Sequence, residues 1–327
     1  MGRRRTVFAA GKTLRNQCYS TRGIIYSMAT NLSPAMVEVA GFAPEQARWY
    51  CQQLERGKVL FSRAVPFDFP KTDIEFLLSQ KQTGSRFHKN VSYRPAADLL
   101  KGDDSAANDR ERLHGIMRDF SKQVTAFVTR YLAPYAGKFK LDYASYRPLE
   151  EQGRDLPLHK RNDLLHVDAF PTRPTKGARI LRAFVNINPA VSRVWNVGEP
   201  FHEFFPKVAG KNQLNPPHRG ALGAAMASVA SKMGLPVADR SRYDEYMLYL
   251  HDWLKENDDF QKNSTKFELH FPPGCFWMVY TDGVPHAVMS GRYALEQTFI
   301  IPATALVSPE AAPLRVLETA TGMEMAP

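Results

Sequence analysis

The clearest β-strand pattern in this sequence is RILRAFVNIN, residues 179–188. Side chains alternate between the two faces of a strand, so odd-numbered and even-numbered positions form separate faces. The odd-numbered face is mostly apolar, whereas the even-numbered face carries Arg182, Asn186 and Asn188. Polar groups on a buried face need hydrogen-bonding partners. The pattern therefore predicts an inward face that binds a carboxylate, with a solvent-exposed polar face as the alternative.

Further strands and helices are predicted on both sides of this stretch. Period-two or continuous apolar runs indicate strands at 58–62, 138–146, 164–168, 266–271, 275–280 and 293–301. Three- and four-residue apolar spacing indicates helices at 44–54, 73–80, 104–131, 199–209, 219–233 and 242–255. A polar loop is expected at 81–95. This order predicts an α+β domain with a double-stranded β-helix (jelly roll) core, N-terminal helices and a helical insert at about 196–256.

The domain is expected to span residues 38–305, with a segment of different composition at each end. Residues 1–37 contain six basic and no acidic residues and are predicted to be a disordered basic segment. The alternatives are an organellar transit peptide, or a tail upstream of Met28 as the true initiator. Residues 306–327 are predicted to be a C-terminal tail in loop conformation, since the chain after Pro302 is rich in Ala and Pro.

Charge and composition narrow the classes of function. The 43 basic and 33 acidic residues give a formal charge of +10, which suits an anionic partner or serves solubility alone. No stretch approaches about 18 apolar residues, the length that a transmembrane helix needs. Three cysteines cannot form a disulfide framework, so a reducing compartment is expected. The N-terminal segment lacks the apolar region of a secretory signal, so a cytoplasmic location is expected. No nucleic-acid partner is expected, because no element interleaves arginines with aromatic residues along the chain.

The main chemical signal is the pair His166 and Asp168, together with the distant His286. On a strand, residues i and i+2 point to the same face, so a His-x-Asp pair presents both side chains to one point. A third imidazole from another strand completes a facial triad. Two histidines and one carboxylate leave three metal positions open, an arrangement that suits non-haem Fe(II) and oxygen chemistry. Surface or hydrogen-bonded core histidines are the alternative.

Four stretches resemble the Fe(II)/2-oxoglutarate-dependent dioxygenases, and most of all the family of Kdo (3-deoxy-D-manno-oct-2-ulosonic acid) hydroxylases of Gram-negative bacteria. They are RFHKNVSYRP (86–95), NDLLHVDAFPTRP (162–174), RAFVNINP (182–189) and FPPGCFWMVYTDGVPHAVMSGRYALEQTF (271–299). The resemblance covers about residues 43–305. It implies hydroxylation of the Kdo sugar of lipid A precursors, with Fe(II), 2-oxoglutarate and O2 consumed to give succinate and CO2.

The resemblance also implies roles for individual residues. His166, Asp168 and His286 would be the metal ligands and the catalytic centre. Many of these enzymes bind 2-oxoglutarate through an arginine about ten residues after the distal histidine, but Glu296 occupies that position here. The basic residue is therefore expected to be either Arg292 or Arg182, and we favour Arg182 with Asn186 beside it.

Basic clusters fit a Kdo-containing anionic glycolipid as substrate. The residues expected to bind its carboxylate or phosphates are Arg86, His88, Lys89, Arg94, Arg147 and Arg161, with Arg154 and Lys160 nearby. Such a lipid substrate would bring the protein into peripheral contact with the inner face of the cytoplasmic membrane. Two alternatives stay open: the same chemistry on a protein side chain or small metabolite, and a non-enzymatic jelly-roll module that binds anionic glycans.

Overall fold

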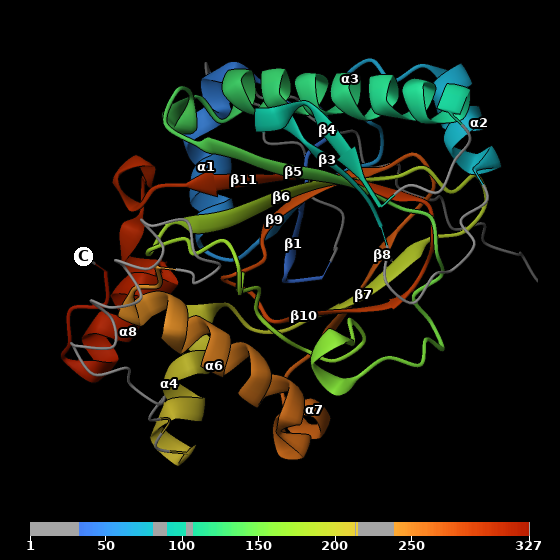
Figure 1. Cartoon of the computed structure of the whole chain (residues 1–327). Helices are drawn as coiled ribbons and strands as arrows, with labels where there is room; N and C mark the ends of the chain where they lie inside the picture. Colours follow the sequence, from blue (N-terminus) through green and yellow to red (C-terminus); the bar gives the residue numbers. More distant parts are fainter. Residues whose placement is uncertain (1–32, 81–89, 103–106, 213, 215–238, 327) are drawn as a thin grey trace, which may run out of the picture.

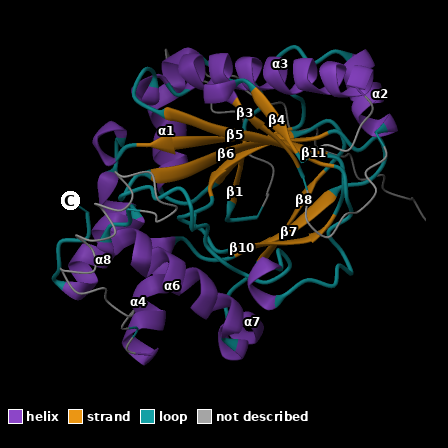
Figure 2. Cartoon of the chain, viewed as in Figure 1, coloured by secondary structure: helices purple, strands orange, loops and turns teal. Residues whose placement is uncertain are grey.

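Two β-sheets face each other in this chain (Figures 1 and 2). The computed structural model describes residues 33–80, 90–102, 107–212, 214 and 239–326. The large sheet has, in spatial order, β1 (Met36–Glu38), β2 (Val59–Ser62), β9 (Phe276–Tyr280), β6 (Arg179–Asn186), β11 (Ala294–Ile301), β5 (Lys140–Arg147), β3 (Val91–Arg94) and β4 (Leu99–Lys101). The small sheet has β10 (His286–Ser290), β7 (Arg193–Val197) and β8 (Phe267–Phe271).

Three N-terminal helices cover the outer face of the large sheet. They are α1 (Ala47–Glu55), α2 (Lys71–Ser79) and α3 (Ala107–Tyr131). Figure 1 shows α3 lying along this face. Its residues Phe120, Val124 and Phe127 are buried at helical spacing, and they share one apolar core with Leu181 and Val185 of β6. The odd-numbered face of β6 thus points to α3, which turns the even-numbered face toward the small sheet.

A second group of helices packs at the other side of the small sheet (Figure 1). It contains α4 (Phe201–Asn212), α6 (Arg242–Glu256), α7 (Asp258–Asn263) and α8 (Pro313–Thr321). These helices share an apolar core with Leu165 and Val167. Because these two residues alternate with His166 and Asp168, the other two side chains lie on the opposite face of the segment, toward the space between the sheets. The ring of His166 also contacts His251 of α6, with ring centroids 5.0 Å apart.

The α+β class and the two-sheet core are as the sequence predicts, and the first and last helices of the insert are present. The expected helix at 219–233 and most of the basic segment 1–37 lie outside the described residues. The loop prediction for the tail is wrong, because α8 buries Leu314 and Leu317 against α4 and α6. Five of the described strands were missed: β1, β3, β4, β7 and β10. Residues 91–94 form β3 rather than a loop, and β7 precedes the helical insert.

Candidate metal and cosubstrate site

His166, Asp168 and His286 come together between the two sheets. Ligand atoms of all three side chains lie within 4.8 Å of one another. His286 begins β10, and His166 pairs with it through two backbone hydrogen bonds of 3.1 and 2.9 Å. Outside this pairing, residues 164–168 do not form the predicted strand. The backbone bridge fixes the two imidazoles side by side, with ring centroids 4.7 Å apart.

Both imidazole rings are held in one orientation by a backbone carbonyl. Nδ1 of His166 lies 2.8 Å from the carbonyl oxygen of Leu164, and Nδ1 of His286 lies 3.0 Å from that of Val284. A carbonyl only accepts, so Nδ1 donates its proton in both rings. The lone pair of each neutral ring is then on Nε2, which is the arrangement that metal-binding histidines usually show.

The electrostatics favour the protonation states that bind a metal. Burial lowers the pKa of His166 well below its usual value of 6.5, and repulsion by His286 lowers it further. Burial likewise lowers the pKa of His286. Burial alone would raise the pKa of Asp168, but Arg182 and the two histidines outweigh it and hold this pKa below its usual range. At neutral pH the site therefore has two neutral imidazoles and one carboxylate.

A cavity adjoins the three ligands and is lined by polar atoms that lack partners. Its walls are formed by Arg147, Asn162, His166, Asp168, Arg182, Phe184, Arg193, Trp195, His286 and Val288. Among the described residues, four buried atoms of this lining have no hydrogen-bond partner: Oδ2 of Asp168, Nε of Arg182, Nε of Arg193 and Nε1 of Trp195. Native structures leave few buried polar atoms unpaired. Two of these atoms, Nε of Arg182 and Oδ2 of Asp168, face each other at 3.4 Å as an ion pair without a hydrogen bond, whereas Nε of Arg193 and Nε1 of Trp195 are unpaired donors. Such a lining indicates a ligand with anionic oxygens and a cation.

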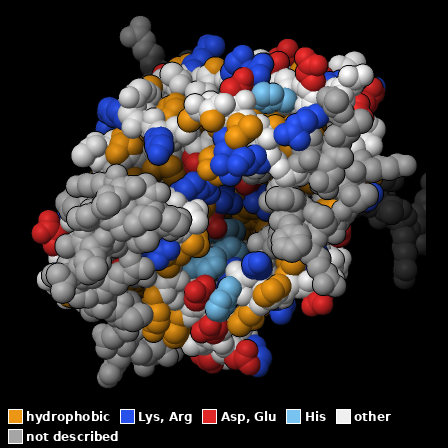
Figure 3. Space-filling view, in the orientation of Figure 1, with side chains coloured by type: hydrophobic (Ala, Val, Ile, Leu, Met, Phe, Trp, Pro, Cys, Tyr) orange, Lys and Arg blue, Asp and Glu red, His pale blue; other side chains and the backbone are white. Residues whose placement is uncertain are grey.

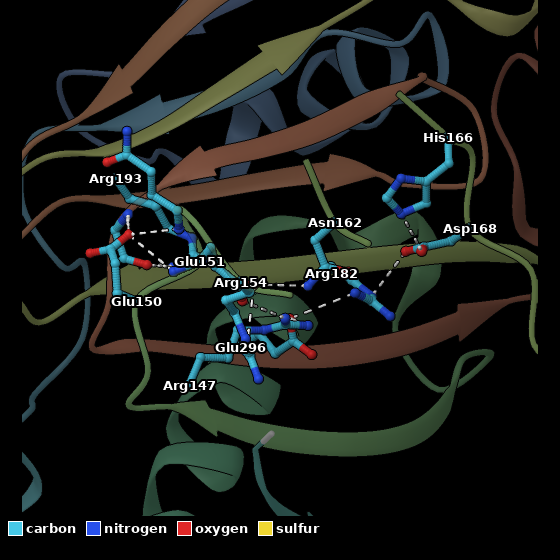
Figure 4. Close-up of polar contacts among 12 residues, drawn as sticks. Arg147, Glu150, Glu151, Arg154, Asn162, His166, Asp168, Arg182, Arg193 and Glu296 are labelled. Atoms are coloured by element: carbon cyan, nitrogen blue, oxygen red, sulfur yellow. Dashed lines mark hydrogen bonds and ion pairs between the residues drawn. The ribbon is translucent and has the colours of Figure 1, made fainter. Parts of the chain in front are cut away.

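Glu296 balances the arginines of the cavity (Figure 4). It lies 2.9 Å from a guanidinium nitrogen of Arg147 and 3.6 Å from one of Arg182, while Nε of Arg182 lies 3.4 Å from Asp168. Burial would raise the pKa of Glu296, but Arg147 and Arg182 lower it, so it is ionised. Burial and repulsion from Arg147 lower the pKa of Arg193 to about 10, which leaves Arg193 charged at neutral pH.

The structure brings only some of the predicted binding residues to this cavity. Arg182 and Arg147 line it. Asn186 and Arg292 do not: the Asn186 amide donates to the carbonyls of Val191 and Phe271, and the exposed Arg292 lies over the ring of Tyr293.

The expected substrate-binding residues are distributed over several places. Arg161 pairs with Asp163, and Arg154 lies 3.7 Å from Glu151 behind the cavity. Arg94 is on β3, over the ring of Tyr143. Arg86, His88 and Lys89 lie outside the described residues.

Sequence reasoning missed Arg193, Trp195 and Asn162. A signal for the first two was present, because RVWNV (193–197) alternates as a strand does and places Arg193 and Trp195 on one face. Both side chains are buried, and Trp195 stacks on His286 with ring centroids 5.4 Å apart. Asn162 stands in a loop, and no sequence pattern marks it.

A two-sheet core with a two-histidine, one-carboxylate triad between the sheets defines the class of non-haem iron oxygenases. The comparisons identify the family. A model of the 3-deoxy-D-manno-oct-2-ulosonic acid (Kdo) hydroxylase family matches residues 38–324. The chain therefore belongs to the Kdo hydroxylase family.

Solved structures of a relative agree with this assignment. The chain is similar to the Kdo hydroxylase KdoO, a non-haem Fe(II) α-ketoglutarate-dependent dioxygenase, in complex with α-ketoglutarate and Fe(III), at 35% identity and a TM-score of 0.78. The match covers 89% of this chain and 97% of that chain. The apo structure of KdoO matches at 36% identity and a TM-score of 0.79, over the same shares of the two chains. A search of curated protein sequences gives no match.

Proposed function

We propose that this chain hydroxylates the Kdo sugar with Fe(II) held by His166, Asp168 and His286 and with 2-oxoglutarate bound in the adjoining cavity. The observation that carries the proposal is the coincidence of the triad with the unpaired donors of that cavity. The donor set fits the metal, because both Nε2 atoms are free and the carboxylate is ionised. Membership of the Kdo hydroxylase family supports the substrate.

Bound iron supplies the oxidation of a C–H bond by O2, with 2-oxoglutarate as the co-reductant that leaves as succinate and CO2. The chain's own residues hold and orient the reactants. The Leu164 and Val284 carbonyls keep the imidazoles in the metal-binding tautomer. Arg182 holds the Asp168 carboxylate, and Glu296 keeps Arg182 and Arg147 in place. Trp195 lines the cavity and stacks on the ring of His286.

The charges of the cavity suit a dianion that arrives with a divalent metal. The guanidinium groups of Arg147, Arg182 and Arg193 are matched by the carboxylates of Asp168, Glu296 and Glu151. Fe(II) and 2-oxoglutarate bring opposite charges of equal size, so binding both keeps this balance. Arg193 is the best candidate for the far carboxylate, because its buried Nε has no hydrogen-bond partner among the described residues, whereas Nε of Arg182 faces Asp168 at 3.4 Å. Arg182 lies beside the metal ligand Asp168. Arg182 and Arg147 still line the cavity and contribute to its positive charge.

The experiment is a hydroxylation assay on Kdo-lipid A with Fe(II), 2-oxoglutarate and ¹⁸O2, read by mass spectrometry of the lipid. The expected result is a gain of one ¹⁸O atom per modified sugar by the native protein, and none by the His166→Ala variant. Succinate formed without any change in lipid mass would show the same chemistry on another substrate. Neither product, from a protein shown to be iron-loaded, would overturn the proposal.

We also propose that the protein works in the cytoplasm and contacts the membrane surface where a lipid substrate lies. Among the described residues, no helix combines the length and the apolar character needed to cross a bilayer. The six basic residues of segment 1–37 would attract anionic headgroups. Flotation with anionic liposomes, with and without residues 1–27, tests the contact. Equal flotation of the two proteins would exclude a role for the basic segment.

A further inference from the structure

Three arginines alternate with two aromatic rings beside the metal site. The guanidinium carbon of Arg182 lies 5.7 Å from the ring centroid of Phe170, and that of Arg173 lies 4.2 Å from the same ring. Arg173 also lies 4.1 Å from the ring centroid of Tyr143, over which Arg94 lies at 4.8 Å. We call this series, Arg182–Phe170–Arg173–Tyr143–Arg94, the arginine–aromatic ladder.

The ladder leads outward from the metal ligands. At its inner end, Nε of Arg182 lies 3.4 Å from Asp168, and Phe170 follows Asp168 by two positions. At its outer end, Tyr143 belongs to β5 and Arg94 to the neighbouring strand β3. The side chain of Arg182 is 13% exposed and that of Arg173 is 32% exposed.

The ladder and the cavity share one face of the large sheet. Along β5 the even-numbered residues from Asp142 to Tyr146 are buried, whereas Tyr143 and Arg147 belong to the half-buried odd-numbered set. Arg147 lines the cavity, so Tyr143 points to the same side. Figure 3 shows a hollow near the middle of the view in which histidine side chains gather, with lysine or arginine side chains along its upper edge.

The outer arginines keep donors free for a ligand. When a guanidinium stacks on a ring, its N–H groups lie in the guanidinium plane and point past the edge of the ring, where they can bind a planar anion. Nε of Arg94 is buried and has no hydrogen-bond partner among the described residues. Arg173 uses Nη1 to contact Asp142, the one carboxylate that pairs with either arginine in the described part of the chain. The outer end of the ladder therefore carries an excess positive charge.

We propose that Arg173 and Arg94 bind the carboxylate of the sugar substrate and so place the sugar in front of the metal. This inference rests on the proposed function, in which the substrate is a sugar acid. A carboxylate matches the flat fork of a guanidinium in two parallel hydrogen bonds, and the aromatic faces of Phe170 and Tyr143 hold each fork in a fixed plane. Phosphate groups of the lipid offer similar oxygens, and the experiment separates the two sources.

The test compares the native protein with Arg173→Gln on three substrates: Kdo-lipid A, the same lipid with the sugar carboxylate converted to a carboxamide, and the dephosphorylated lipid. Hydrogen bonds to charged groups are worth about 1.5–3 kcal/mol, so we expect kcat/KM on Kdo-lipid A to fall roughly 10- to 100-fold, mainly through KM. With the native protein, kcat/KM on the carboxamide lipid should be lower than on Kdo-lipid A by a similar factor. Arg173→Gln should lower kcat/KM on the carboxamide lipid little further. On the dephosphorylated lipid, Arg173→Gln should lower kcat/KM by the same factor as on Kdo-lipid A.

The carboxylate assignment would be overturned if Arg173→Gln lowered kcat/KM on the carboxamide lipid as much as on Kdo-lipid A but had no effect on the dephosphorylated lipid. Unchanged kinetics on Kdo-lipid A would overturn the site itself. If Arg173→Gln does not fold, Tyr143→Leu, which removes a ring and keeps all charges, takes its place with the same expected pattern and a smaller loss.

Arg112→Gln is the matched control, because this arginine also lies over a ring, that of Phe76 at 4.3 Å, but on α3. It should leave the kinetics on all three lipids unchanged. Binding of Fe(II) and 2-oxoglutarate, followed by the visible absorbance of the anaerobic protein, should be the same in Arg173→Gln as in the native protein. Failure of this binding in the native protein would count against the proposed function, independently of the ladder.

Discussion

Strand β6 carries two buried arginine–aspartate pairs that differ in how completely they are bonded. Nε of Arg179 lies 2.7 Å from Asp282, both side chains are 1% exposed, and the second oxygen of Asp282 accepts from the backbone of Ile180. Arg182, three residues later, lies 3.4 Å from Asp168, and the two facing atoms make no hydrogen bond in the described structure. These side chains are 13% and 12% exposed.

We infer from this comparison that the Arg179–Asp282 pair stabilises the fold, whereas the Arg182–Asp168 pair is positioned to bind ligands. A buried ion pair stabilises only when its remaining donors and acceptors are bonded. Both oxygens of Asp282 accept hydrogen bonds, although Nη1 of Arg179 has no partner among the described residues. Asp168 is bonded less completely: its Oδ2 faces Arg182 at 3.4 Å without a hydrogen bond, and its Oδ1 lies 3.8 Å from Nε2 of His166. The same residue types on one strand thus serve stability at one point and metal and anion binding at the next.

The largest expected effect is on activity. Replacing Asp168 with Ala removes a proposed metal ligand and the partner of Arg182. We expect turnover to fall by more than the roughly 10- to 100-fold that loss of an outer-shell contact causes. The measurement is succinate release in the presence of Kdo-lipid A, with iron content determined in parallel. Retained iron and near-native turnover would contradict the assignment of Asp168.

The second expected effect is on stability and distinguishes the two pairs. Asp282→Asn leaves Arg179 buried without a charged partner, which costs about 3–5 kcal/mol in comparable cases. Asp168→Asn should change the unfolding free energy of the metal-free protein by less than about 1 kcal/mol, because Arg182 keeps Glu296 as a partner. Urea unfolding with EDTA present measures both. If Asp168→Asn lowered the free energy of unfolding more than Asp282→Asn does, the roles assigned to the two pairs would be wrong.

The third effect concerns the cosubstrate and compares Arg193 with Arg182 and Arg292, the two arginines that the sequence left open. Arg193→Gln removes the unpaired buried donor and should raise the Kd for 2-oxoglutarate roughly 10- to 100-fold. Arg182→Gln should weaken iron and 2-oxoglutarate together, since Arg182 also holds Asp168. Arg292→Gln should change neither, because this side chain lies over Tyr293 outside the cavity. Calorimetric titration of the cobalt-loaded protein gives the three values, and a large effect of Arg292→Gln would refute the placement.

The smallest effect is a dependence of stability on pH. His166 and His286 have lowered pKa values in the folded metal-free protein, whereas the unfolded chain takes up protons near the usual value of 6.5. Below about pH 6.5 the unfolded state binds more protons, so stability falls as pH falls, by at most about 1.4 kcal/mol per pH unit and histidine. Urea unfolding at pH 7.5 and 5.5 measures this loss. His286→Gln should reduce it, and an unchanged slope would show that this histidine is not buried in its neutral form.

The sequence predicted the parts of the fold and site that follow from local pattern. The alternation in residues 179–188 predicted the direction of Arg182, and the His-x-Asp spacing predicted that His166 and Asp168 share a face. The helix α8 was missed because its apolar residues are few and its burial depends on α4 and α6, which tertiary packing decides. Glu296 drew attention only as a departure from a family pattern.

The other missed features depend on segments far apart in the chain. The cavity gathers Arg147, Arg182 and Arg193 from three strands, and no sequence spacing relates them. The same is true of the arginine–aromatic ladder, whose members come from β3, β5, β6 and the loop after Asp168. Along the chain no such alternation exists, because it depends on the register of the large sheet and on the position of the loop that carries Phe170 and Arg173.

One measurement tests the central claim most directly, that the unpaired atoms beside the triad form a joint site for iron and 2-oxoglutarate. Fe(II) and then 2-oxoglutarate are added to the anaerobic protein while the visible spectrum is recorded. We predict a weak charge-transfer band that needs both ligands, is present in the native protein and in folded Asp282→Asn, and is absent in Asp168→Ala. A band that survives in Asp168→Ala, or none in the folded native protein, would contradict the account.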